Sequence, residues 1–277
     1  MIIEKHPKYW WQYKAWPDIV RQAKTNDIAI LPLGSIEWHG PHLPTGHDTI
    51  QLFPMLEMIA ERTGAMLLPC PWYGAHPCHH YGVPGTIPIR NETMVNLVKD
   101  IVHGASVAGY NKFILFYGHG QIAMADFAVQ ELGLEGYFVA SVMFQNLTKD
   151  VQFKIMEKGF WRADESETSI GLYTHPEFVD MSKAAKQDPE PMLIDSKFVQ
   201  GVSEASTSKP LAWFDLTVLR PESQMVAEGA SGVFGDPTIA TREKGEKYVQ
   251  VIVDRMVELV DHIKEKYPAG VKPFTLK

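Results

Sequence analysis

Short apolar runs alternate with helix-like stretches through the first half of the chain, and this rhythm constrains the fold more than any other feature. Apolar runs of strand length occur at residues 28–33, 65–69, 112–117 and 137–144. Stretches typical of helices lie between them, at residues 48–64, 91–109 and 121–132. Alternating strands and helices predict an α/β fold with a mostly parallel sheet covered by helices.

The last part of the chain predicts one long helix. Asp236 offers an N-cap, Pro237 suits the first helical position, and apolar residues then recur with helical spacing over 238–267. The middle of the chain is less regular. Residues 145–165 are compatible with helical or irregular structure, and residues 182–235 predict long loops with a short strand over 212–219. No linker-like stretch divides the chain, so we expect a single domain over residues 1–277.

Composition narrows the class of protein. The 277 residues are 45% hydrophobic, enough to bury a large core, and the net charge of −7 argues against a nucleic-acid partner. No stretch reaches the roughly 18 apolar residues of a membrane span, and the N-terminus lacks the pattern of a signal peptide. Cys70 and Cys78 fit no common zinc motif and are interpreted as two thiols in a reducing compartment. We therefore expect a cytoplasmic protein without a membrane partner.

The segment after the first predicted strand concentrates groups that bind metals. In open α/β sheets the ligand site lies beyond the carboxyl ends of the strands, and Glu37, His39 and Asp48 follow the first strand. Glu37 and His39 share a face of an extended segment. Imidazole and carboxylate are suitable ligands for zinc, manganese or iron. These residues predict a divalent metal site, with zinc as first choice.

Other interpretations of this segment stay open. Asp48 is also a possible N-cap of the next helix, with Gln51 completing a capping box. His42 and His47 are expected to hydrogen-bond neighbouring groups rather than to bind a metal.

Three further segments offer chemically active side chains. His119 lies between two glycines at the end of the third predicted strand. The glycines let the backbone turn sharply and expose the imidazole for a function, although an ordinary strand-to-helix turn that happens to contain a histidine fits the same pattern. Residues 164–169 offer carboxylates, although acids also favour a helix N-terminus. A Gly/Pro-rich loop carries His76, His79 and His80, of which we expect at most one to touch a substrate. No nucleotide-binding or serine-hydrolase motif occurs.

Five blocks in order resemble the creatininase family. LPLGSIEWHGPHLPTGHD resembles its G-S-x-E-x-H-G-x-H-L-P signature, with an acidic residue eleven positions after the glutamate. HHYGVPGTI, YGHGQ, ESETS and SGVFGDPTIATREKGEKYV resemble its H-x-x-F-P-G-T-I, N-G-H-G, E-T-S and G-V-x-G-D-P blocks. The resemblance implies a three-layer α/β/α fold, a homohexamer, and one or two divalent metals per chain.

The resemblance also implies roles for individual residues. One metal would be held by Glu37, Asp48 and His119, and the other by His39, Asp48 and a further carboxylate. Creatininase places that carboxylate two residues after the GH histidine, where this chain has Gln121, so we expect Glu167 of the E-T-S block instead. Two positions depart from the family, because Tyr117 replaces an asparagine and Arg162 replaces a histidine. Both departures argue against creatinine itself as the substrate. The residues expected to bind the substrate are Arg162, Gln121, Trp161 and Tyr117.

The implied activity is hydrolysis of a small cyclic or amide-type substrate by a metal-activated water. The leaving atom must be protonated, and Glu165 and His80 are the predicted catalytic acids. One alternative is a C–C bond hydrolase that opens a diketo-cyclitol ring of the 3-dehydro-scyllo-inosose type, for which an oxygen-binding Arg162 is suited. Another is a small-molecule-binding protein with a degenerate site.

Overall fold

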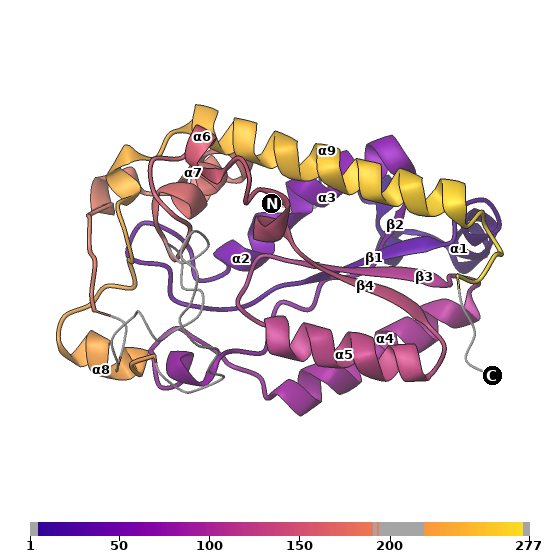
Figure 1. Ribbon diagram of the computed structural model, residues 1–277, viewed down its shortest axis with the longest axis horizontal. Coiled ribbons are helices and arrows are strands. Elements are labelled where there is room, and N and C mark those ends of the chain that lie inside the picture. Colours follow the sequence, from indigo (N-terminus) through magenta and orange to yellow (C-terminus); the bar gives the residue numbers. More distant parts are fainter. Residues whose placement is uncertain (1–4, 191–192, 194–218, 274–277) are drawn as a thin grey trace.

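A four-stranded sheet forms the centre of the molecule (Figure 1). The computed structural model describes residues 5–190, 193 and 219–273. The strands β1 (Ile28–Leu33), β2 (Met66–Leu67), β3 (Lys112–Tyr117) and β4 (Phe138–Met143) are all parallel and lie in the order β2-β1-β3-β4. The predicted α/β class is confirmed.

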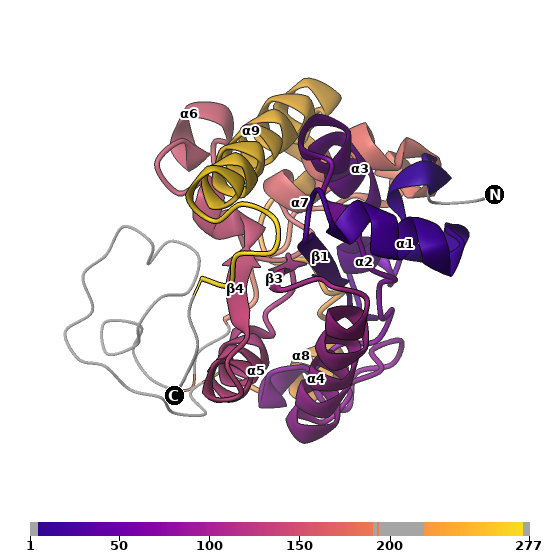
Figure 2. The same cartoon turned by 90° about the vertical axis from the view of Figure 1, so that its right-hand side faces the viewer.

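Both faces of the sheet are covered by helices, because alternate residues of each strand point to opposite sides (Figure 2). Ile28 and Ile30 of β1 pack with α3 (Leu52–Thr63) and α9 (Arg242–Lys266). Ala29 and Leu31 face a second cluster. That cluster is built with α1 (Trp16–Ala23), α4 (Asn91–Val107) and α5 (Ile122–Leu134). This gives the three layers of helix, sheet and helix.

The C-terminal helix begins later than the sequence predicts. The Asp236 side chain accepts a hydrogen bond from the Thr238 amide and caps a single 3-10 turn, Pro237–Ile239. The chain is extended at Ala240, and Thr241 then caps α9. The prediction that the helix starts at 238 is therefore wrong, because Asp236 caps a separate turn. From Tyr248 onward the predicted apolar face is buried in the core.

The predicted helix over 48–64 is two helices. The first is α2 (His47–Ile50), and α3 follows after Gln51 and ends at Gly64, which has a φ of 71°. Strand β2 has two residues, fewer than predicted. Residues 145–165 contain a 3-10 turn at Phe144–Leu147 and α6 (Gln152–Ile155). Nearly all of the short strand predicted over 212–219 lies outside the described residues.

One close contact sets the position of α7 (Glu165–Thr174) against α9. Gly245 of α9 lies so near α7 that an added Cβ would stand 1.9 Å from the Ser169 carbonyl oxygen. Because α7 carries Glu167, this contact also places that carboxylate. Within the described residues, no helix is long and apolar enough to cross a membrane.

Candidate metal centre

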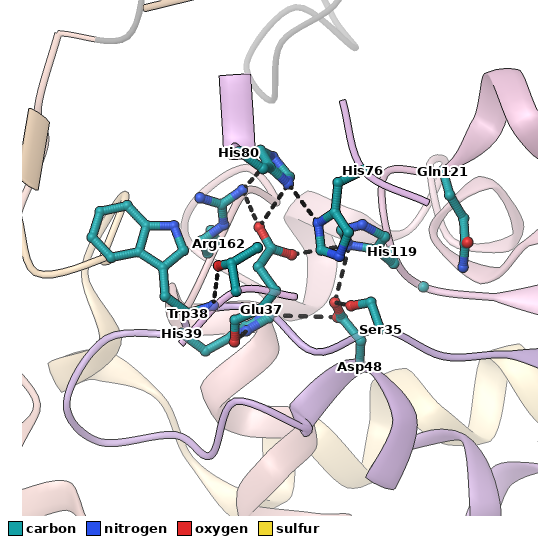
Figure 3. Close-up of polar contacts among 12 residues, drawn as sticks. Ser35, Glu37, Trp38, His39, Asp48, His76, His80, His119, Gln121 and Arg162 are labelled. Carbon is teal, nitrogen blue, oxygen red and sulfur yellow. Dashed lines mark hydrogen bonds and ion pairs between the residues drawn. The ribbon is translucent and has the colours of Figure 1, made fainter. Parts of the chain in front are cut away.

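Five buried polar side chains from four segments meet beyond the carboxyl ends of β1 and β3, and Figure 3 shows four of them, Glu37, His39, Asp48 and His119. Glu37 and His39 lie on the loop after β1, Asp48 lies in α2, His119 follows β3, and Glu167 lies in α7. These are the five residues that the sequence predicts as metal ligands, and the fold brings them together.

Asp48 lies between two imidazoles and faces each with a different oxygen. Asp48 Oδ2 is 3.1 Å from His119 Nδ1, and Glu37 Oε2 is 2.9 Å from the same nitrogen. On the other side, His39 Nε2 is 3.5 Å from both Asp48 Oδ1 and Glu167 Oε2. The five side chains therefore form two adjacent ligand sets that share Asp48.

The loop after β1 fixes Asp48 in this position. Ser35 Oγ donates to Asp48 Oδ2 at 2.6 Å, and Glu37 N donates to the Thr45 carbonyl oxygen at 2.9 Å. Asp48 lies inside the first turn of α2, whose N-cap is Gly46. The alternative in which Asp48 caps the helix is therefore wrong, because its carboxylate faces Ser35 and the imidazoles.

The electrostatics of the cluster fit a divalent cation. Burial alone would lower the pKa of His39, but Asp48 and Glu167 raise it to about 10. Burial likewise opposes protonation of His119, yet Glu37 and Asp48 raise its pKa to about 9. The carboxylates of Glu37 and Asp48, whose pKa values lie well below their usual range, therefore favour positive charge on both imidazoles, whereas burial raises the pKa of Glu167 to about 8. A metal ion supplies that charge more directly, and carboxylate and imidazole are ligands that zinc and manganese accept.

Two more histidines adjoin Glu37. His80 Nδ1 is 3.1 Å from Glu37 Oε1 and 3.2 Å from His76 Nδ1. The His76 ring lies 4.3 Å from the His119 ring, and burial lowers the pKa of His76 to about 3. Ligand atoms of Glu37, His76, His80 and His119 all lie within 4.8 Å of one another. The sequence predicted His80 at the site but not His76, although both lie in the same Gly/Pro-rich loop.

Arg162 also lies at the cluster, as expected. Its buried guanidinium forms ion pairs with Glu37 and with Glu222 of α8 (Glu222–Ala227). Burial alone would raise the pKa of Glu37, but Arg162, His80 and His119 hold it well below its usual range. Glu222 was not predicted, because it follows a loop-rich segment and belongs to none of the five blocks. Trp161 stacks on Phe234, with ring centroids 5.2 Å apart.

Three predicted site residues have other contacts. Glu165 accepts hydrogen bonds from the amides of Glu157 and Lys158 and from Lys244 Nζ, so its position does not support the predicted role as an acid. Tyr117 is in the core, with its hydroxyl 2.9 Å from Ser141 Oγ.

The side-chain amide of Gln121 likewise forms its hydrogen bonds with backbone groups. It donates to the carbonyl oxygens of Leu33 and Gly34 and accepts from the Ala75 amide. Gln121 therefore holds the loops after β1 and β2 in place, and Tyr117 joins β3 to β4, so their positions do not support substrate binding.

Comparisons with known proteins agree on one family. The Creatininase family model, described as creatinine amidohydrolase, matches residues 12–260. The 3-dehydro-scyllo-inosose hydrolase of Thermotoga maritima is 32% identical, over 98% of this chain and 88% of its own. The creatinine amidohydrolase of Pseudomonas putida is 26% identical, over 94% and 95% of the two chains. A crystal structure of creatininase superposes with a TM-score of 0.73 at 23% identity, covering 94% of this chain and 98% of that one.

Proposed function

The chain belongs to the creatininase family, and from that premise we propose that it is a metal-dependent hydrolase of a small substrate. One observation carries the proposal: Asp48 presents one oxygen to the set of Glu37 and His119 and the other to the set of His39 and Glu167. Zinc is the first choice of metal, with manganese or iron as alternatives. Assembly as a homohexamer and a cytoplasmic location stay predictions.

The protein's own residues prepare the site for hydrolysis. Glu37, Asp48 and His119 would hold one ion, and His39, Asp48 and Glu167 the other. Bound divalent ions supply a water of lowered pKa and polarise the scissile carbonyl group. Burial lowers the pKa of His80 well below its usual range, so this imidazole is neutral near pH 7. We propose that His80, from its position beside Glu37, takes up the proton that the attacking water loses and passes it to the leaving atom.

For the substrate, we propose a cyclic polyhydroxy 1,3-diketone. Water adds to one carbonyl, the bond to the carbon between the two carbonyls breaks, and the ring opens to a carboxylate and an enolate that is protonated on carbon. The T. maritima inosose hydrolase supports this choice, because its 32% identity extends over nearly the whole chain. Arg162 beside Glu37 also suits an oxygen-rich substrate. A cyclic or linear amide is the second candidate, since the P. putida relative is a creatinine amidohydrolase. Turnover of an oxidised inositol, measured against a panel of lactams and formamides, decides between the two.

The variant Asp48→Ala tests the metal-dependent reaction itself. Because both ligand sets share Asp48, we expect the variant to lose both ions and at least about 100-fold in turnover. Metal content is measured by mass spectrometry on the folded protein, with circular dichroism to check the fold. Full metal content together with full turnover in Asp48→Ala would show that the shared-carboxylate arrangement is not the active centre.

A further inference from the structure

The two oxygens of Glu37 face different partners. Oε2 lies 2.9 Å from His119 Nδ1, on the side of Asp48. Oε1 faces the other way, toward His80 Nδ1 at 3.1 Å and the guanidinium of Arg162 (Figure 3). A carboxylate held in this way presents one oxygen to the candidate metal position and leaves the other to the protein.

The Arg162 side chain is itself fixed by its surroundings. Its side chain is buried, and its Nη2 lies 2.6 Å from His80 Nε2. The guanidinium carbon lies 5.9 Å from the centre of the Trp38 ring and 5.5 Å from that of Phe234. A planar guanidinium can bind two carboxylates at once, and Arg162 uses that capacity to join Glu37 to Glu222.

Glu222 is the outer end of this chain of contacts. It is only 2% exposed, although it begins the short surface helix α8. One carboxylate oxygen accepts a hydrogen bond from Trp38 Nε1 at 2.6 Å, and the other pairs with Arg162 and lies 3.4 Å from His80 Nε2. The Trp38 indole and the Arg162 guanidinium both donate to this carboxylate, which is therefore fixed in place and in turn fixes the guanidinium.

We propose that Glu222 is a positioning residue of the metal centre, which acts through Arg162 to hold Glu37 with Oε2 alone facing the ion. The inference rests on the proposed function, because it requires that the centre bind a divalent cation. It assigns to α8 a role in metal binding that the ligand residues alone do not suggest.

The proposal predicts that loss of Glu222 affects only one of the two candidate metal positions. Glu37 belongs to the ligand set of Asp48 and His119, whereas the set of His39, Asp48 and Glu167 has no contact with Arg162 among the ion pairs of the described residues. Loss of the Glu222 charge frees the guanidinium to turn and releases Glu37. We therefore expect weaker binding of the ion at Glu37 and unchanged binding of the ion at Glu167.

The experiment places Glu222→Gln in two backgrounds. In His39→Ala only the set with Glu37 remains complete, and in His119→Ala only the set with Glu167 does. Zn²⁺ and Mn²⁺ dissociation constants are measured by calorimetry on the full chain. In the His39→Ala background Glu222→Gln should weaken binding by about 10–100-fold, the usual cost of losing a partner of a metal ligand. In the His119→Ala background the change should stay within about twofold.

Glu228→Gln is the matched control. Glu228 is the C-cap of α8 and also pairs with an arginine, at 2.7 Å from Arg220 Nη2, but its side chain is 64% exposed. The same chemical change there should leave both dissociation constants as they were. A general loosening of α8 would weaken binding in both backgrounds, so this pair of measurements separates positioning from stability.

A double variant tests the route through Arg162. If Glu222 acts through that side chain, Glu222→Gln with Arg162→Gln should bind metal no more weakly than Arg162→Gln alone. If Glu222→Gln does not fold, Trp38→Phe removes the indole donor to Glu222 together with part of the ring that packs near Arg162, and it should give a smaller loss, again at the Glu37 position alone. Equal affinities with and without Glu222, or fully additive losses, would overturn the inference while leaving the hydrolase proposal intact. A wild-type chain that binds no divalent ion would overturn both.

Discussion

At the scale of single residues, the proposed function assigns the two imidazoles of the candidate centre to different ions. His119 faces Asp48 Oδ2 and His39 faces Asp48 Oδ1. We therefore expect His39→Ala and His119→Ala each to lower the metal content by about one ion per chain, and neither to empty the site. Metal analysis of the purified variants checks this result. His103→Ala, at a half-exposed histidine on α4, is the control and should keep the full content. Loss of both ions from either single variant would mean that one shared position binds metal.

Sequence reasoning found the site residues that lie close together in the sequence or directly after a strand, and it missed those that reach the site through distant contacts. Glu37, His39 and Asp48 lie in one short segment, and His119 follows a strand directly, so local pattern was enough to predict them. Local pattern did not predict where Glu165 points: neighbours on a helix face different directions, and its carboxylate pairs with Lys244.

Glu222 shows the limit of local pattern. Its hydrogen bonds at the site are with Arg162 and Trp38, which are 60 and 184 positions away along the chain. No local motif encodes such a contact, because it depends on how the whole chain folds.

At the scale of elements, the contact between α7 and α9 sets the position of Glu167. Gly245→Ala would place a methyl group 1.9 Å from the Ser169 carbonyl oxygen, so the helices must separate. We expect a loss of about 1–3 kcal/mol in the free energy of unfolding. Metal affinity should fall as well, because Glu167 moves with α7. Denaturant unfolding and metal titration measure the two effects.

Gly133→Ala makes the same substitution at a position with open space, and we expect the opposite effect on stability. Gly133 lies in α5, and an added Cβ there would meet nothing within 4 Å. The substitution should stabilise the protein by about 0.5–1 kcal/mol, because alanine favours helix more than glycine does. If both variants destabilise alike, close packing of α7 on α9 is not the cause of the loss at Gly245.

Element boundaries were harder to predict than the elements themselves. The strands β1 and β3 have the predicted limits because all six residues of each are buried. Nearly all of these residues are apolar, and the charged one forms an ion pair. Lys112, for example, is buried at the start of β3, where its ammonium group lies 2.7 Å from Asp27 Oδ1. The start of α9 was misplaced because Asp236 and Thr241 both offer caps, and only the folded chain selects between them.

At the scale of the whole molecule, the candidate centre joins segments that are far apart in the sequence. The loop after β1, α2, the turn after β3 and α7 each contribute a ligand, and these segments belong to both sides of the sheet. Without a cation, the buried carboxylates of Glu37 and Asp48 depend on protonated imidazoles for compensation, and burial raises the pKa of Glu167 to about 8. Metal binding should therefore stabilise the fold as a whole and not only the loop after β1.

Removal of metal by a chelator tests this coupling. A ligand present at 100 times its dissociation constant stabilises the folded state by about 2.7 kcal/mol. For a chain of this size we expect the chelator to lower the midpoint of thermal unfolding by roughly 5–10 °C for each ion removed. Added Zn²⁺ or Mn²⁺ should restore the midpoint. Asp48→Ala is the control, because a variant without a complete ligand set should unfold at the same temperature with and without chelator. Identical midpoints for the wild-type protein in both conditions would show that no bound ion links these segments.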